Sequence, residues 1–224
     1  MGKHINVAID GPAGAGKSTI AKMLAVALGC IYVDTGALYR TIAYSVLKSG
    51  IDPNDKAAVI DNLGKIGIDI VYEDGVQKVL LDGEDVSGLI RTENVSKAAS
   101  LTSAIPEVRS YLLGLQRRLA EQTSVVMDGR DIGTVVLPDA NVKIFLTASA
   151  EERANRRYKE LIEKGEKADY NEVLSEIKER DERDMNRAVA PLKCADDAVL
   201  IDSSDMTIDE VVAAMKNAAE QKLC

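Results

Sequence analysis

The fold of this chain is decided by nine residues near its N-terminus, Gly11-Pro12-Ala13-Gly14-Ala15-Gly16-Lys17-Ser18-Thr19. They match the phosphate-binding pattern G-x-x-x-x-G-K-S/T and lie between an apolar run at 5–9 and a helical pattern. The glycines let successive backbone N–H groups turn toward one anion, Lys17 can reach the β- and γ-phosphates, and the Ser18 hydroxyl can hold Mg²⁺. A flexible Gly/Ala loop is the alternative, but the flanking strand and helix favour a nucleoside triphosphate site.

Composition limits the kinds of partner that the chain can have. It has 224 residues, a formal net charge of −8, no Trp and only 4% aromatic residues. The negative charge argues against a general binder of nucleic acid or membrane surfaces, and the scarce aromatic residues argue against base stacking on exposed rings. Cys30, Cys194 and Cys224 are widely spaced, which is typical of reduced thiols in a cytosol. We therefore expect a cytoplasmic protein without a nucleic-acid or membrane partner.

Short apolar runs at 5–9, 30–33, 125–127, 142–146 and 198–201 are typical of strands buried on both faces of a sheet. Helical patterns separate them, which predicts βαβ units and a parallel sheet. The fold class is therefore α/β, a P-loop NTPase fold with a five-stranded parallel sheet flanked by helices. The first helix is expected to end at Gly29 and to bury an apolar stripe made of Ile20, Met23, Leu24, Ala27 and Leu28.

Two segments depart from this alternation of strands and helices. Residues 67–86 alternate apolar and polar side chains around Asp74-Gly75, which predicts a small antiparallel hairpin outside the main sheet. Residues 160–169 are rich in Lys and Glu between two helical patterns. We interpret this second segment as a short, mobile helical lid.

Polar residues follow two of the predicted strands at the sheet edge where open α/β folds bind ligands. After the second strand, Thr35 is expected to cap the next helix and Arg40 to face an anion near its start. After the third, Asp128-Gly129-Arg130-Asp131 offers a carboxylate to orient a Mg²⁺-bound water and a guanidinium to bind phosphate. A structural cap and a salt-bridged loop are the respective alternatives.

Arginines gather near the C-terminal end of the chain. Arg153, Arg156 and Arg157 start the helix before the lid, and Asp184 continues the apolar stripe of the helix after it. Flanking residues Arg180 and Arg187 lie to one side of that stripe. A solvated charged face would explain any one of them, but the set as a whole favours a cage around a transferring phosphoryl group.

With these residues in view, the chain resembles the bacterial cytidylate kinases. The matching segments are GPAGAGKST at 11–19, DTGALYR at 34–40, DGRDIGTVVLPDA at 128–140 and RDMNRAVAPL at 183–192. The first segment is generic to P-loop proteins, whereas the other three together are specific, and their order fits nearly the full length. The resemblance implies transfer of the γ-phosphoryl group of ATP to CMP or dCMP, with Mg²⁺, in a monomer of one domain at 1–224. It also implies an acceptor-binding insertion at 60–102 and a lid at 154–172.

The resemblance further implies a role for each matched residue. Residues 11–19 would cradle ATP, with Lys17 catalytic and Ser18 and Asp128 at the metal. The CMP phosphate would be bound by Thr35, Arg40 and Arg130, and the cytosine by Ser100, Arg109 and Asp131. The ribose and phosphates would be held by Arg180, Asp184 and Arg187, and the donor covered by Arg157.

Two other functions are compatible with the phosphate-binding loop. One is a small P-loop kinase acting on AMP, UMP, dTMP or shikimate, which the D-G-R-D and D-x-x-R-x-x-A-P-L segments disfavour. The other is a GTPase-like switch or regulatory module. The chain has no N-K-x-D segment for guanine, and a switch does not need a second cage of arginines.

Overall fold

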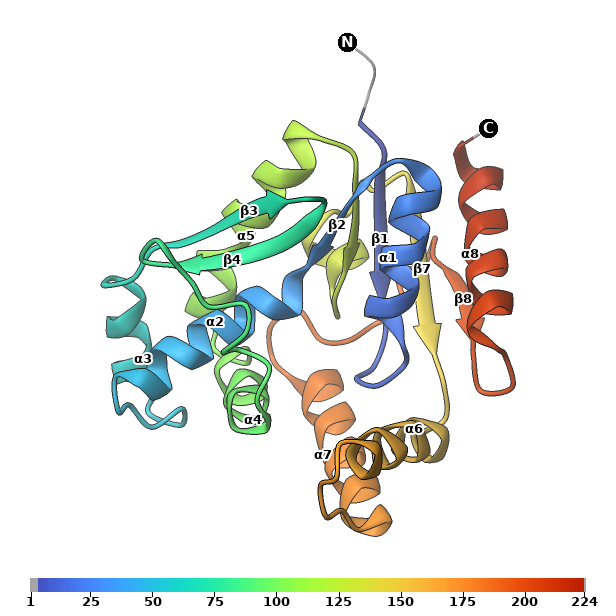
Figure 1. Cartoon of the computed structure of the whole chain (residues 1–224). Helices are drawn as coiled ribbons and strands as arrows, with labels where there is room; N and C mark the ends of the chain where they lie inside the picture. The colour runs from blue at the N-terminus through green and yellow to red at the C-terminus, as the bar shows by residue number, and fades with distance from the viewer. Residues whose placement is uncertain (1–3, 224) are drawn as a thin grey trace.

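The main sheet is parallel and five-stranded, as the apolar runs predict. The computed structural model describes residues 4–223. The strands lie in the order β2 (Ile31–Asp34), β6 (Val125–Asp128), β1 (Asn6–Asp10), β7 (Val142–Thr147) and β8 (Val199–Asp202). Each predicted strand is found within a residue or two of its expected bounds, and the predicted fold class is confirmed (Figure 1).

Helices cover both faces of this sheet. The α-helices are α1 (Lys17–Leu28), α2 (Thr35–Lys48), α3 (Lys56–Leu63), α4 (Glu93–Thr102), α5 (Pro106–Gln122), α6 (Ala150–Glu163), α7 (Tyr170–Asn186) and α8 (Ile208–Leu223). A π-helical turn, η1 (Ile132–Val136), follows β6. Helices α1 and α8 share one core with Val7 and Ile9, whereas α5 and η1 pack with Ala8 on the other face. This split follows from the alternation of side chains along β1.

The stripe predicted for α1 is wrong at two positions. Met23 and Ala27 are exposed, and Ala21 and Ala25 are buried in their place. Small side chains let the helix lie close against the sheet, so its contact stripe runs through the two alanines, Ile20 and Leu24. The predicted helix end is confirmed, because Gly29 has φ 65° in the left-handed region.

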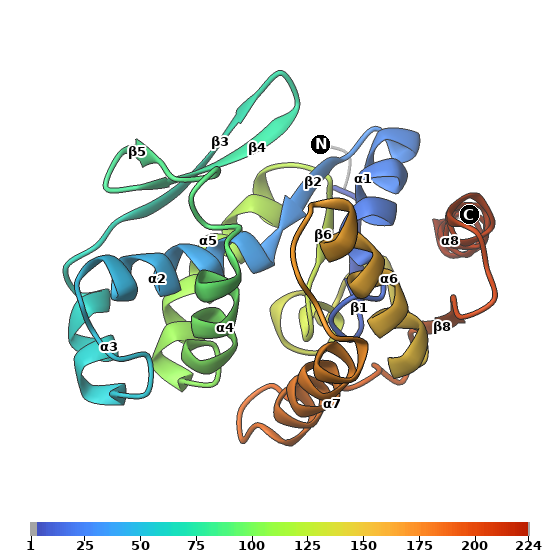
Figure 2. The same ribbon diagram turned by 60° about the horizontal axis from the view of Figure 1, so that its bottom comes forward.

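The predicted hairpin is confirmed and belongs to a larger unit. Strands β3 (Ile68–Glu73) and β4 (Val76–Leu81) pair antiparallel around Asp74 and Gly75, which both have positive φ. A short third strand, β5 (Glu84–Asp85), pairs with β4. This small sheet packs with α2, α3, α4 and α5 around a core of its own, on one side of the main sheet (Figures 1 and 2).

The wider lid range, 154–172, is mostly helical, whereas most of 160–169 is a loop. Helix α6 continues to Glu163, and α7 begins at Tyr170, so only residues 164–169 form a loop. The two helices lie side by side in both views and share a small core (Figures 1 and 2). Within residues 4–223, none of the helices combines the length and the apolar character that crossing a bilayer requires. Cys224 lies outside the described residues, and His4 is exposed.

Candidate active site

The carboxyl ends of the central strands open into a cavity of about 520 Å³. Its wall is formed by the phosphate-binding loop, the start of α2, the segment between β6 and η1, and side chains of α4 to α7. Its charged lining has seven basic and five acidic side chains: Lys17, Arg40, Arg109, Arg130, Arg156, Arg180 and Arg187, with Asp34, Asp128, Asp131, Glu160 and Asp184. Positive charge is therefore concentrated here in a chain whose net charge is −8.

Glycines with positive φ shape the phosphate-binding loop. Gly11 has φ 146°, and a Cβ there would lie 1.9 Å from the Leu146 carbonyl oxygen. Gly16 is the N-cap of α1 with φ 84°, so the loop delivers Lys17 and Ser18 at a helix N-terminus. The Lys17 ammonium is buried and donates to the Pro12 carbonyl at 2.6 Å. Burial, with the nearby Arg130 charge, holds its pKa well below the usual value.

Ser18 and Asp128 meet from opposite sides of the sheet edge. The Ser18 hydroxyl donates to the Asp128 carboxylate at 2.9 Å, and Tyr32 donates to its other oxygen at 2.8 Å. Burial raises the pKa of Asp128, and the neighbouring Asp34 carboxylate raises it further. A cation bound beside these groups would counter both effects.

The cap of α2 differs from the prediction. Asp34, not Thr35, is the N-cap, because its carboxylate accepts from the Ala37 N–H at 2.9 Å. Thr35 instead donates to the Asp128 carbonyl at 2.7 Å, which ties the start of α2 to the end of β6. The second Asp34 oxygen accepts from Arg40 Nη2 at 2.9 Å and so directs that guanidinium along the cavity wall.

The D-G-R-D segment is connected to α7 and α5 by ion pairs. Arg130 Nε donates to Asp184 at 2.9 Å, and Arg109 donates to Asp131 in a buried pair. Arg187 approaches Asp131 at 3.4 Å. Burial by itself would raise the pKa of Asp184, but the Arg130 and Arg180 charges outweigh it and lower that pKa. The alternative of a salt-bridged loop is thus partly correct, since these ion pairs exist within the cavity wall.

Two of the cavity arginines have donors to spare. Among residues 4–223, the buried Nε atoms of Arg40 and Arg180 have no hydrogen-bond partner. Burial and the nearby Arg130 charge together lower the pKa of Arg180 to about 10. Buried donors without acceptors are costly, so both guanidinium groups are suited to an anionic ligand.

Five of the predicted site residues do not line the cavity: Gly11, Pro12 and Ala15 of the phosphate-binding loop, together with Ser100 and Arg157. The Ser100 hydroxyl is buried and accepts from Arg183 Nη1 at 3.0 Å, whereas Ser103, one helical turn further on, is in the wall. Arg157 is 39% exposed and pairs with Glu160 at 2.9 Å, while its neighbour Arg156 lines the cavity. The helix that carries Arg157 is the expected one, but it presents Arg156 to the cavity instead. No helix was predicted around Ser100, where α4 ends just before Ser103.

Two buried carboxylates next to the site, those of Asp10 and Asp181, were not predicted as site residues. Asp10 accepts from the Ile132 and Gly133 N–H groups at 2.7 Å each and thereby holds η1 against β1. Burial raises its pKa to about 6, although these two hydrogen bonds lower it. Arg153 of α6 forms a two-fold hydrogen-bonded pair with Asp181 of α7. A signal existed for Asp10, which is a charged residue that ends a continuous apolar run.

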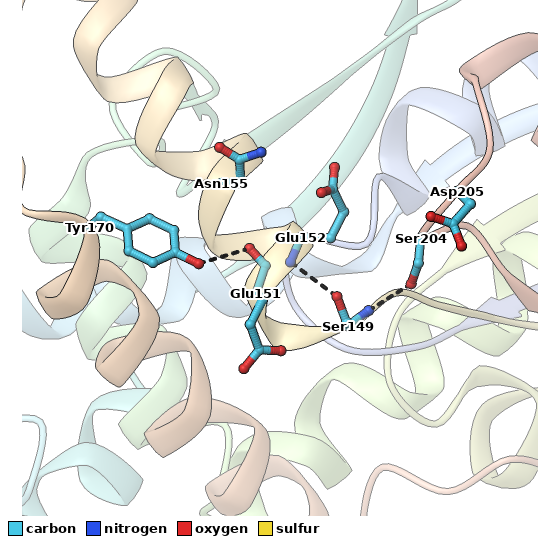
Figure 3. A pocket seen from close by; sticks show the side chains of 7 residues that line it. All are labelled: Ser149, Glu151, Glu152, Asn155, Tyr170, Ser204 and Asp205. Carbon is cyan, nitrogen blue, oxygen red and sulfur yellow. Dashed lines mark hydrogen bonds between the residues drawn. The ribbon is translucent and has the colours of Figure 1, made fainter.

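A second, shallower hollow of about 350 Å³ lies at the start of α6 (Figure 3). Ser149, the N-cap of α6, accepts from the Glu152 N–H at 3.1 Å and donates its own N–H to Ser204 at 3.0 Å. The Tyr170 hydroxyl donates to the Glu151 carbonyl at 3.4 Å. Three carboxylates line this hollow and no basic side chain does, so it is not suited to phosphate.

The combination of a phosphate-binding loop with a second cage of arginines agrees with the known proteins that the chain matches. The family model described as cytidylate kinase matches residues 7–221. The cytidylate kinase of Caldicellulosiruptor bescii is 55% identical over 210 residues, which cover 94% of this chain and 93% of that protein. This chain belongs to the cytidylate kinase family.

Two further comparisons extend this result. A cytidylate kinase of Mannheimia succiniciproducens is 48% identical over 223 residues, which cover 100% of this chain and 99% of that protein. The match to the family therefore spans the insertion, the candidate lid and the sheet alike. A crystal structure of an uncharacterized protein from Eubacterium ventriosum has a TM-score of 0.53 at 14% identity, covering 97% of this chain and 99% of its own. That likeness concerns the fold alone.

Proposed function

We propose that this member of the cytidylate kinase family transfers the γ-phosphoryl group of ATP to CMP or dCMP in the cavity at the sheet edge. Family membership supports this reaction and ATP as its co-substrate. The observation that carries the assignment to this cavity is its buried basic charge, with unpartnered donors on Arg40 and Arg180 among residues 4–223. Two nucleotides bring several phosphate charges together, and such a cage neutralises them.

The donor side of the proposal rests on the phosphate-binding loop. Residues 11–19 surround the ATP phosphates with backbone N–H groups at the N-terminus of α1. Lys17 exchanges its bond to the Pro12 carbonyl for a phosphate oxygen. A bound anion restores the charged form of a lysine whose pKa burial has lowered, so ligand binding and Lys17 protonation reinforce each other. Arg157, or its cavity-lining neighbour Arg156, covers the donor from the lid at 154–172.

Ser18 and Asp128 fit a Mg²⁺ ion. A hydroxyl and a carboxylate oxygen lie in hydrogen-bond contact at 2.9 Å, and both are ligand types that Mg²⁺ accepts alongside water and substrate phosphate. When bound, Mg²⁺ supplies positive charge to the phosphates between which transfer occurs. Tyr32 donates to Asp128 and keeps its carboxylate oriented toward Ser18.

The acceptor side is assigned to the facing residues. Thr35, Arg40 and Arg130 bind the CMP phosphate, and the ribose and phosphates are held by Arg180, Asp184 and Arg187. The cytosine lies toward Arg109 and Asp131, whose carboxylate can accept from the exocyclic amine. Ser100 belongs to this group only indirectly, through its bond to Arg183. The insertion at 60–102 closes this side with α4, which contributes Ser96 and Ala99 to the cavity wall.

The reaction requires alignment more than proton transfer. The attacking phosphate oxygen of CMP is ionised near neutral pH, so no side chain needs to act as a general base. The residues of this chain hold donor and acceptor in line, neutralise their repulsion and exclude water when the lid closes. One chain supplies all of these groups, so the proposal includes a monomer, which light scattering at the assay concentration tests.

The test is Mg²⁺-dependent release of ADP from ATP with CMP, dCMP, UMP, AMP and shikimate offered separately. We expect turnover led by CMP and dCMP. Arg130→Met should lower kcat/KM about 100-fold or more, because removing one donor that stabilises charge in the transition state typically has an effect of this size. Arg118→Met is the matched control, because Arg118 is exposed and does not line the cavity. Turnover led by another acceptor would overturn the acceptor assignment, and an active Arg130→Met enzyme would overturn its role.

A further inference from the structure

Strand β2 lies at one end of the main sheet and pairs with β6 on one side only. The Ile31 N–H donates to the Ser124 carbonyl on the β6 side. Because backbone groups alternate along a strand, those of Tyr32 and Asp34 point to the opposite edge. Within the described residues, 4–223, no strand of the main sheet follows on that edge. Its backbone groups therefore need partners from elsewhere in the chain.

Side chains of the β3–β4 hairpin supply those partners. The Gln77 amide oxygen accepts from the Asp34 N–H at 2.8 Å, and its nitrogen donates to the Asp34 carbonyl at 3.3 Å. The Tyr72 hydroxyl donates to the Tyr32 carbonyl at 3.1 Å. Tyr72 and Gln77 are direct partners in the β3–β4 register, so they reach β2 together. One glutamine thus makes the pair of hydrogen bonds that a neighbouring strand would make.

The residue held in this way controls an arginine of the cavity. Asp34 caps α2 through Ala37, and its other oxygen accepts from Arg40 at 2.9 Å, with Arg91 at 3.6 Å. The carboxylate is 9% exposed, and the Arg40 side chain is 23% exposed. A shift of the Asp34 backbone therefore moves the anchor of a guanidinium that lines the cavity and whose buried Nε has no partner in residues 4–223.

We infer that Gln77 is a positioning residue for the acceptor phosphate. By fixing both backbone groups of Asp34, it fixes the carboxylate that orients Arg40. The hairpin belongs to the insertion at 60–102. Because of this contact, the orientation of the Arg40 guanidinium depends on whether the insertion is docked against β2. The inference rests on the proposed function, in which Arg40 binds the phosphate of CMP.

The variant Gln77→Leu tests it, because leucine has a similar size and removes both hydrogen bonds. We expect KM for CMP to rise about threefold to tenfold, the range that corresponds to the net contribution of one ordinary hydrogen bond. KM for ATP and kcat should stay within about twofold, since the donor side is not connected to this contact. The matched control is Lys78→Met, because Lys78 lies next to Gln77 on β4. This substitution removes the ion pairs of Lys78 with Glu73 and Asp85 and leaves the contacts to β2 in place.

A double-mutant cycle with Arg40→Lys tests the route. If Gln77 acts through Arg40, Gln77→Leu should raise KM for CMP by less than twofold in the Arg40→Lys background. Each of three results would overturn the inference: fully additive effects of Gln77→Leu and Arg40→Lys on KM for CMP, no change of that KM in Gln77→Leu, or an equal change in Lys78→Met. Circular dichroism and thermal unfolding establish that the variants are folded. If the wild-type enzyme does not phosphorylate CMP, the proposed function is overturned. If the wild-type enzyme is active and Gln77→Leu has the same KM for CMP, only the role of Gln77 is overturned.

Discussion

Removing the carboxylate of Asp181 should destabilise the protein far more than removing a surface charge from the same pair of helices. The Arg153 side chain is 5% exposed and that of Asp181 13%. Two hydrogen bonds join them, at 3.0 and 2.5 Å. Asp181→Ala leaves the guanidinium buried with only the Ala148 and Ala13 carbonyls as acceptors, at 2.9 and 3.0 Å. Breaking a buried pair from one side costs about 3–5 kcal/mol.

The assay is urea and thermal unfolding of three variants. For a chain of this size, 3–5 kcal/mol corresponds to a fall in Tm of about 6–20 °C. Asp181→Asn keeps an acceptor and should lose about 1–3 kcal/mol. Glu151→Ala breaks the exposed ion pair with Lys178 between the same helices and should lower Tm far less than Asp181→Ala. If Asp181→Ala and Glu151→Ala unfold alike, the view that this pair anchors α7 to the phosphate-binding loop is refuted.

Three other perturbations have definite expected outcomes. The pKa of Asp10 is about 6 in the folded protein and 3.8 ordinarily, so the folded state binds this proton more tightly than the unfolded state does. The stability that this group contributes is therefore present at low pH and is lost as pH rises through about 6. The free energy of unfolding of wild type relative to Asp10→Asn should therefore fall by about 3 kcal/mol between pH 3.5 and 7 in urea titrations, and a constant difference would contradict this. Gly11→Ala should lower Tm by more than 6 °C, which is about 2 kcal/mol or more, because its Cβ would clash with the Leu146 carbonyl at 1.9 Å. Gly50→Ala, with φ 70° and open space, should cost only about 1 kcal/mol, and equal losses would refute the clash. Lys17→Met should reduce kcat about 100-fold or more in the ADP-release assay without lowering Tm, because it removes a buried charge along with a catalytic donor. A loss of Tm comparable to that of Gly11→Ala would show that Lys17 is mainly structural.

The strands of the main sheet could be predicted because parallel strands covered on both faces are apolar throughout. Details set by tertiary contacts could not. Thr35 and Asp34 are adjacent and both are good N-cap residues, so local preference does not choose between them. The choice is made by the Asp128 carbonyl, 93 residues away in sequence, which engages the Thr35 hydroxyl and leaves Asp34 to cap α2.

The same limit applies to the candidate site. Arg130 and Asp184 were predictable because charges interrupt a strand end and a helix stripe where apolar residues are expected. Asp181 lies on that helix too, but its importance comes from Arg153, 28 residues earlier, and no local pattern links them. The π-helical turn η1 was not predicted for a similar reason, since Asp10 holds its first N–H groups from 122 residues away.

The side-chain cover over β2 has a consequence for the solubility of the chain. A strand at the end of a sheet offers unpaired backbone groups that another chain can use to extend the sheet, and this is a common start of aggregation. On β2 the Tyr32 carbonyl is engaged by Tyr72 and both backbone groups of Asp34 by Gln77, and the hairpin that carries these side chains lies against the edge. Each time the hairpin lifts away, Tyr32 and Asp34 become available to a foreign strand. The rate of self-association should thus follow the undocking of the hairpin, even in molecules whose main sheet stays intact.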